Sequence, residues 1–301
     1  MEREAGHCCV LRAEVVELLN PAGREVLLDC TVGLGGHAEA LLDAGGREAR
    51  LIGMDVDEAN LRLAGRRLRP FRDRVRLFHA NFAEVELVLA EAGVAAADVL
   101  LADLGVASNQ LDDPARGLSF SRDGPLDMRL DRRGGRTAAD LVNRLGEKDL
   151  ADLIYAYGQE RFSRWIARAI VTARKQKPLT GTVELADVIC GAIPAAARKA
   201  RRGVHPATRT FQALRIAVND EITNLERLLA ALPKILAAGG AAGVISFHSL
   251  EDVRVKRAFA ALAGTGSWRL LTKKPITPSA PERAENPRSR PAKLRTIERL
   301  T

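Results

Sequence analysis

The chain has 301 residues, enough for one large domain or two modest ones. Hydrophobic residues make up 47% of it, which disfavours wholesale disorder, and no apolar run reaches the roughly 18 residues that a membrane span needs. Residues 1–19 lack a signal-peptide pattern, and the four cysteines lack the spacing of metal ligands. These features predict a cytoplasmic enzyme with neither a metal ion nor a membrane as partner.

The positive charge of the chain is concentrated in its middle. The formal net charge is +8, and residues 115–206 alone contain 18 Lys and Arg against 10 Asp and Glu. The remainder of the chain is therefore neutral. Such a segment is either a solvated basic face or a module that binds a polyanion on a neutral scaffold.

The first hundred residues alternate between strand and helix patterns. A buried strand is predicted over 25–30, and further strands over 49–56, 74–82 and 98–105. Helices are predicted between them, over 36–45, 57–68 and 83–93. This alternation predicts a parallel sheet with helices on both faces.

The pattern changes after residue 112. Residues 113–136 are rich in Gly, Pro and charge, which predicts a loop. Helices are then predicted from Thr137, whose side chain can cap the first turn, over 159–176 and over 182–193. With no convincing strand pattern among them, these segments indicate an α-helical insertion.

The strand and helix alternation resumes after the insertion. One long amphipathic helix is predicted from Arg209 to Leu232, ended by Pro233. A strand over 240–250 and a helix over 251–264 follow. The last two strands, 268–274 and 293–300, are predicted to pair at the sheet edge, with a long loop between them.

A glycine-rich turn follows the first strand. Gly33, Gly35 and Gly36 permit positive φ and close approach of a ligand to the backbone, and the helix start offers free N–H donors. The next strand ends in Asp55, a position suited to accept hydrogen bonds from ribose hydroxyls. Together these features predict a cofactor that contains adenosine.

The residues around this turn favour S-adenosylmethionine over NAD. The order of glycines differs from the dinucleotide fingerprint, and no Gly-Lys-Ser/Thr follows, which excludes a Walker P-loop. Asp29 at the end of the first strand disfavours a pyrophosphate. A carboxylate there instead suits a cationic sulfonium ligand.

Four polar side chains come at or just past the ends of predicted strands: Asp29, Asp55, Asp103 and His248. Ligands of parallel α/β sheets bind beyond the carboxyl ends of the strands, so we expect these side chains to converge. Each has a plainer alternative as well. Asp103 could anchor a loop or cap a helix, and His248 could be a structural histidine bonded to the backbone.

Four stretches resemble the RsmH (MraW) family of bacterial 16S rRNA (cytosine-N4) methyltransferases. They are 103–129, 205–221, 245–257 and 285–295, and the resemblance extends from His7 to Arg299. It implies a class I (Rossmann-like) S-adenosylmethionine-dependent methyltransferase fold, α/β with a mostly parallel seven-stranded sheet. It also implies an inserted α-helical domain, so we expect a discontinuous methyltransferase domain, 1–114 and 207–301, and an RNA-recognition domain, 115–206. The implied target is a cytosine at the decoding centre (P site) of the small ribosomal subunit.

The resemblance also implies functions for individual residues. Its cofactor contacts fall on Gly35, Gly36, His37, Asp55, Phe82, Asp103 and Gln110. We assign catalytic roles to Asp103 and His248. Asp103 is placed to hold either the target amine or the amino-acid end of the cofactor. DNA amino-methyltransferases carry an Asp/Asn-Pro-Pro-aromatic motif at this strand end, whereas this chain has Asp103-Leu-Gly-Val, so the base-stacking aromatic must come from elsewhere.

The basic insertion is expected to hold phosphates of 16S rRNA within the small ribosomal subunit. The candidate contacts are Arg129, Arg201 and Arg202, together with Arg132, Arg133 and Arg136. A homodimer is a further possibility. One alternative is a non-catalytic RNA-binding or assembly factor, against which the intact glycine and aspartate set argues. Another is a small-molecule methyltransferase or NAD oxidoreductase, against which the concentrated positive charge argues.

Overall fold

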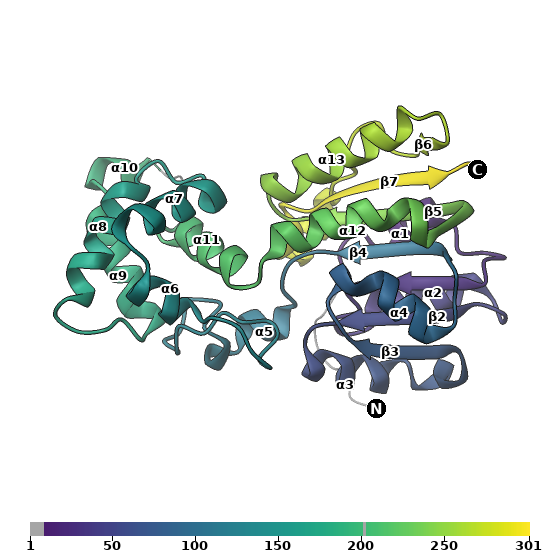
Figure 1. Cartoon of the computed structure of the whole chain (residues 1–301), viewed down its shortest axis with the longest axis horizontal. Helices are drawn as coiled ribbons and strands as arrows, with labels where there is room; N and C mark the ends of the chain where they lie inside the picture. Colours follow the sequence, from purple (N-terminus) through teal and green to yellow (C-terminus); the bar gives the residue numbers. More distant parts are fainter. Residues whose placement is uncertain (1–8, 201–202) are drawn as a thin grey trace. The chain divides into compact units, whose positions relative to one another are not determined.

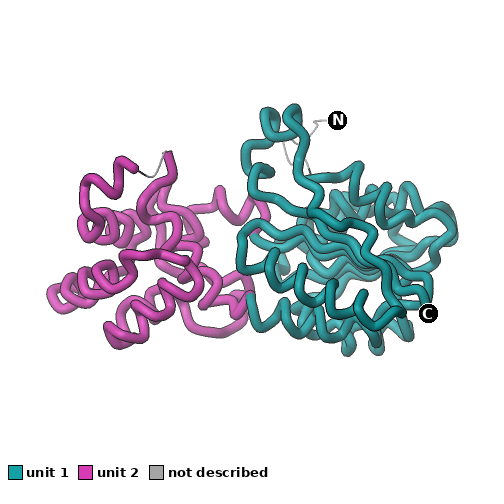
Figure 2. Tube along the Cα trace, turned by 90° about the horizontal axis from the view of Figure 1, so that it is seen from above, with its two compact units in different colours: residues 1–105, 222–301 teal, residues 106–221 magenta. Residues whose placement is uncertain are grey.

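A computed structural model describes residues 9–200 and 203–301, and the chain divides into two compact units (Figure 2). Unit 1 consists of Met1–Gly105 and Ile222–Thr301, and unit 2 is Val106–Glu221. Unit 2 begins earlier and ends later in the sequence than the predicted insertion, 115–206. Over its full length it contains 20 Lys and Arg against 14 Asp and Glu, so it holds +6 of the net charge of +8.

Unit 1 is built on one sheet of seven strands. They are β1 (Val26–Asp29), β2 (Arg50–Asp55), β3 (Val75–His79), β4 (Ala97–Asp103), β5 (Leu236–Ser246), β6 (Trp268–Leu270) and β7 (Lys293–Arg299). Their order is β3-β2-β1-β4-β5-β7-β6, in which β1 to β5 are parallel and β7 is antiparallel to both of its neighbours. The last two strands pair as expected, but β7 lies inside the sheet and only β6 is at its edge.

Helices cover both faces of this sheet, as Figure 1 shows. One face carries α1 (Arg12–Leu19), α2 (Gly36–Gly45) and α3 (Glu58–Arg67); the other carries α4 (Val85–Ala92), α12 (Glu221–Ile235) and α13 (Ser249–Ala263). Successive strand residues point to opposite faces, so Leu27 joins the first layer and Leu28 the second. Strands buried on both sides are apolar throughout, which is why the sequence pattern located them.

The predicted single helix over 209–232 is two helices. The first is α11 (Thr208–Val218), whose apolar side chains belong to the core of unit 2, and the second is α12, whose apolar side chains belong to the core of unit 1. Asp220 between them has a left-handed backbone, φ 48°. The predicted stop is also wrong, because α12 continues past Pro233 to Ile235.

Unit 2 is α-helical around its own core. Besides α11 it contains α5 (Ser108–Asp112), α6 (Ala138–Arg144), α7 (Glu147–Gly158), α8 (Ser163–Arg174), α9 (Thr182–Ala192) and α10 (Ala195–Lys199). The capping of α6 by Thr137 is as expected, with the Asp140 N–H donating to Thr137 Oγ1 at 3.1 Å. The helix α7 was not predicted.

The remaining elements are short. The segment predicted as a long loop after β6 contains α14 (Ala280–Glu285), and short 3₁₀ helices occur at Arg69–Arg74, Phe82–Glu84, Pro114–Arg116 and Pro287–Ser289. Among the described residues, no helix has both the length and the apolar character to cross a membrane.

Candidate active site

Three aspartates end three neighbouring strands of unit 1. Asp55, Asp29 and Asp103 are the last residues of β2, β1 and β4, which lie side by side in the sheet. In the strand register Asp29 is opposite Gly53 and Leu101, so Asp55 and Asp103 each extend two residues beyond it. The structure therefore brings these carboxylates together at the carboxyl ends of the parallel strands. We call this side of the sheet the acidic edge.

Asp29 is buried at the centre of this edge, with 1% of its surface exposed. Its Oδ1 accepts a hydrogen bond from the Thr31 N–H at 3.0 Å, whereas its Oδ2 has no hydrogen-bond partner in the described part of the chain. Burial raises the pKa of Asp29 to about 7, and the neighbouring charges of Asp103 and Asp55 add to the increase. A carboxylate in this state gains from a cationic ligand.

Asp103 lies beside His37 of helix α2. The Asp103 N–H donates to Thr31 Oγ1 at 2.6 Å, and its Oδ2 is 3.5 Å from His37 Nε2. Its Oδ1 is buried and has no hydrogen-bond partner among the described residues, although 25% of the side chain is exposed. Burial alone would lower the pKa of His37, but Asp103 and Asp29 together outweigh it and the pKa is raised.

Asp55 organises the glycine-rich turn. Its Oδ2 accepts from the Gly33 N–H at 2.9 Å, and its Oδ1 accepts from the Asp57 N–H at 2.8 Å. Asn60 Nδ2 adds a longer contact of 3.4 Å. A carboxylate has about four acceptor sites, so Asp55 keeps capacity for a ribose hydroxyl. Burial raises its pKa to about 6.

The three glycines of the turn serve different purposes. Gly33 and Gly35 have left-handed backbones, with φ of 50° and 82°, as the sequence predicted. Gly36 instead starts α2 without a positive φ, and a Cβ there would overlap Cys9 Sγ. Gly36 is thus required by the packing of the N-terminal segment against the helix start.

Phe82 and Gln110 are the other two predicted cofactor residues. Phe82 follows β3 and packs partly buried against the core of unit 1. Gln110 belongs to unit 2, where its Oε1 accepts from the Ala107 N–H at 2.9 Å at the start of α5. The structure thus gives Gln110 a helix-capping position, and its contact with a cofactor stays a prediction.

His248 occupies the capping position of α13. Its Nδ1 accepts from the Glu251 N–H at 3.3 Å, and Glu251 Oε1 is 3.2 Å from its Nε2. Glu251 in turn accepts from the Phe247 N–H at 2.8 Å. This arrangement matches the structural alternative weighed for His248, and a catalytic role for it stays a prediction.

Two residues of the site were missed in the sequence. Thr31 positions Asp103 through its hydroxyl, and no local signal distinguishes it. Phe247 lies two residues beyond Ile245, the register partner of Asp103, so it is beside Gly105. A Cβ on Gly105 would be 3.5 Å from the Phe247 ring. An aromatic residue directly after a strand was the available signal.

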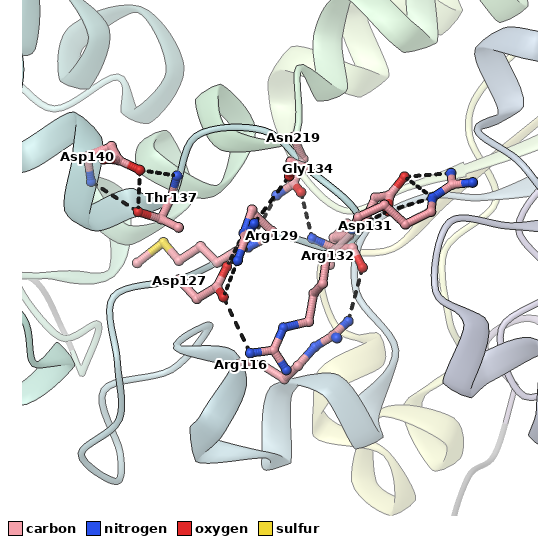
Figure 3. Close-up of polar contacts among 12 residues, drawn as sticks. Arg116, Asp127, Arg129, Asp131, Arg132, Gly134, Thr137, Asp140 and Asn219 are labelled. Carbon is pink, nitrogen blue, oxygen red and sulfur yellow. Dashed lines mark hydrogen bonds and ion pairs between the residues drawn. The ribbon is translucent and has the colours of Figure 1, made fainter.

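The arginine cluster of unit 2 is tied to internal acids (Figure 3). Arg129 donates to both oxygens of Asp127, from Nε at 2.7 Å and from Nη2 at 3.0 Å, and Arg132 Nη2 adds a 3.4 Å contact. Burial would raise the pKa of Asp127, but these arginines lower it overall. The guanidinium of Arg129 therefore belongs to an ion-pair cluster within unit 2, and its contact with an RNA phosphate stays a prediction.

The same cluster orders the segment predicted as a loop. Asn219 Oδ1 accepts from the Leu130 N–H at 2.7 Å, and its Nδ2 donates to the Met128 carbonyl at 2.9 Å. Arg133 pairs with Asp131 at 2.6 Å, while Arg136 is exposed. Arg201 and Arg202, the other predicted RNA contacts, lie outside the described residues.

The strand order and the acidic edge together define an S-adenosylmethionine-dependent methyltransferase of class I. The unpaired oxygens of Asp29 and Asp103 fit a ligand with a cationic sulfonium and ammonium, and Asp55 fits its ribose. The chain belongs to the MraW methylase family, whose profile matches residues 4–300.

Curated relatives agree with this assignment over most of their length. "Ribosomal RNA small subunit methyltransferase H" of Geobacter sp. (strain M21) is 49% identical over 310 residues, which covers 98% of each chain. The protein of the same name from Sorangium cellulosum (strain So ce56) is 50% identical over 294 residues, covering 98% of this chain and 91% of that one.

Asp55→Asn is expected to weaken S-adenosylmethionine binding about tenfold or more, because a hydrogen bond to a charged group contributes about 1.5–3 kcal/mol. Asn is preferred to Ala because its side-chain oxygen can still accept a hydrogen bond from one of the two N–H groups, that of Gly33 or that of Asp57. Calorimetry with the purified protein measures the change, and thermal unfolding checks that the fold survives. Unchanged affinity would remove Asp55 from the cofactor site.

Proposed function

We propose that the chain transfers a methyl group from S-adenosylmethionine to the exocyclic N4 amine of a cytosine at the decoding centre of 16S rRNA. The names of the relatives support small-subunit rRNA as substrate, and the cytosine target comes from the motifs that resemble the RsmH (MraW) family. The observation that carries the proposal is Asp103, whose buried Oδ1 is unpaired among the described residues at the end of β4.

Asp103 suits the chemistry of an amine that is a poor nucleophile. The lone pair of cytosine N4 is delocalised into the ring, so the amine must be oriented before it can attack. The bound cofactor supplies an electrophilic methyl group on a positively charged sulfur. A hydrogen bond from N4 to Asp103 Oδ1 would align the nitrogen for in-line attack. After transfer the nitrogen must lose a proton, and we assign the acceptance of this proton to the same carboxylate.

Phe247 is our candidate for the aromatic wall of the base site. It follows β5 directly, and the strand register places it next to Gly105, two residues past Asp103. Gly105 has φ 101° and no side chain, so nothing from this residue covers the ring. Phe247 would thus take the place of the aromatic residue that the Asp103-Leu-Gly-Val sequence lacks.

The test is transfer of a labelled methyl group from S-adenosylmethionine to isolated small ribosomal subunits and to naked 16S rRNA. We expect label in the RNA and, after digestion to nucleosides, in N4-methylcytidine. Label in another nucleoside would contradict the target. RNA binding without any transfer, to either substrate, would favour the non-catalytic assembly factor instead.

A further inference from the structure

Helix α8 of unit 2 presents a cationic face with a single large aromatic side chain. Ser163, Ile166, Ala167 and Ile170 are buried in the unit. The opposite face exposes Arg164, Trp165 and Arg168, and Lys175 follows the last turn. Arg164 and Arg168 are four residues apart and Trp165 is three residues before Arg168, so Arg168 has both of the other side chains as neighbours on the helix surface.

Trp165 is exposed although it is among the most costly side chains to leave in water. Its exposed fraction is 55%, and its ring lies 5.7 Å from that of Phe162. The Arg161 guanidinium lies over the Phe162 ring at 4.7 Å. Trp165 thus already packs against a second aromatic ring, and a side chain that is packed before a partner binds loses less entropy on binding.

The charge on this face has little internal compensation. The α8 sequence contains no acidic residue, and Arg164 and Lys175 make no side-chain ion pair within the described chain. Arg168 meets Glu147 at 3.4 Å, but the two side chains are 77% and 45% exposed, so the pair contributes little. Arg129, by contrast, donates to both carboxylate oxygens of Asp127.

A second exposed aromatic in unit 2 provides a comparison. Tyr155 is 64% exposed on α7, a helix that carries three acids, Glu147, Asp149 and Asp152, and one base, Lys148. Acids of this kind repel a polyanion. Of these two exposed aromatic rings among the described residues of unit 2, Trp165 is thus the one on a helix of net positive charge.

We propose that this face of α8 binds an unpaired nucleotide of the RNA substrate, with its base stacked on Trp165 and its flanking phosphates held by Arg164 and Arg168. The proposal rests on the proposed function, because it assigns the surface that holds the same RNA. Stacking on an aromatic ring and phosphate contact by arginine are the two interactions by which proteins hold single-stranded RNA. A paired base has both faces covered, so a duplex offers nothing to the indole.

Tryptophan fluorescence tests the stacking directly. The chain has two tryptophans, and Trp268 is buried, so a Trp268→Phe protein reports on Trp165 alone. We expect quenching when a single-stranded oligoribonucleotide binds, and much less with a duplex of the same composition. Binding of the single strand with unchanged Trp165 emission, or equal quenching by the duplex, would overturn the proposal.

Affinity measurements test its energetic weight. Trp165→Ala is expected to weaken binding of the single strand by roughly 5- to 100-fold, and Trp165→Phe to restore most of it. Arg164→Ala with Arg168→Ala should flatten the slope of log affinity against log salt by about 1.4, since each phosphate contact contributes about 0.7. The control, Arg62→Ala with Arg72→Ala, removes equal charge from exposed positions of unit 1 and should change neither value.

These measurements use the protein without cofactor, so they stand even if no methyl transfer is found. Wild-type affinity of the Trp165→Ala protein for both the oligoribonucleotide and naked 16S rRNA would refute the proposal. Loss of binding to small subunits alone, with RNA affinity intact, would also refute it and would assign the face to a protein partner. Unchanged S-adenosylmethionine affinity shows that the variants are folded.

Discussion

Asp103→Asn is expected to lower the single-turnover rate of methyl transfer by about 100-fold or more, the size of effect seen when one preorganised electrostatic contact is lost. The substitution keeps the size of the side chain but removes its charge and half of its acceptor capacity. An amide N–H group would then face the target amine or the cofactor ammonium. Rapid-quench methylation of small subunits at saturating cofactor measures the rate of the chemical step.

Asp98→Asn is the matched control for this experiment. Asp98 lies near the opposite end of β4, where its Oδ2 accepts from the Glu25 and Val26 N–H groups. It therefore reports what loss of a carboxylate does to the same strand away from the site. RNA affinity should change in neither variant. Transfer at the wild-type rate by Asp103→Asn would show that Asp103 is a structural strand end.

Binding of S-adenosylmethionine is expected to weaken as the pH falls below about 7. Burial holds the pKa of Asp29 at about 7 in the free protein, and only its ionised form attracts a cationic ligand. Affinity for S-adenosylmethionine should therefore fall by up to tenfold for each pH unit below about 7. Below about pH 6 it should fall further, because Asp55 then becomes protonated as well. His37, whose pKa is raised, gains positive charge in the same direction. Calorimetry across pH 5 to 9 measures the profile.

Asp29→Asn is expected to separate binding from stability. The pKa of Asp29 is about 7 in the folded chain and 3.8 in the reference state, so the folded state holds an extra proton between these values. Ionisation therefore lowers the free energy of unfolding as the pH rises from about 4 to 7, by at most about 4 kcal/mol. At pH 8 the variant should unfold at higher temperature yet bind the cofactor more weakly and without the step near pH 7. Equal stability and affinity at pH 8 would show that Asp29 is not an ionised ligand group.

Local periodicity predicted most elements of unit 1 but not their arrangement. The buried strands were located within a few residues because both of their faces are apolar. The position of β7 beside β5 depends on contacts between segments distant in the chain. The break between α11 and α12 was missed for the same reason. The Asn219 side chain at this break forms hydrogen bonds with the backbone of Met128 and Leu130, which are distant in the sequence.

The candidate site and the basic insertion were also predicted only in part from the sequence. Acids at the ends of successive strands must meet at one edge of a parallel sheet, so the convergence of Asp29, Asp55 and Asp103 followed from chain order. Charge counting could not distinguish Arg129, which is neutralised by Asp127, from Arg164, which has no ion pair in the described chain. A sequence shows how many charges a segment has, whereas their pairing is decided by the fold.

The insertion of unit 2 between β4 and β5 has a consequence for how the chain folds. These strands are partners in the sheet, yet β4 ends at Asp103 and β5 begins at Leu236, so their pairing must close a very long loop. The entropic cost of closure grows with the number of flexible residues enclosed. Unit 2 has its own apolar core and emerges from the ribosome before β5 does. When unit 2 folds first, the part of the loop still to be ordered consists of α12 and the short segments beside it, so early collapse of the insertion accelerates completion of the sheet that carries Asp29, Asp55 and Asp103.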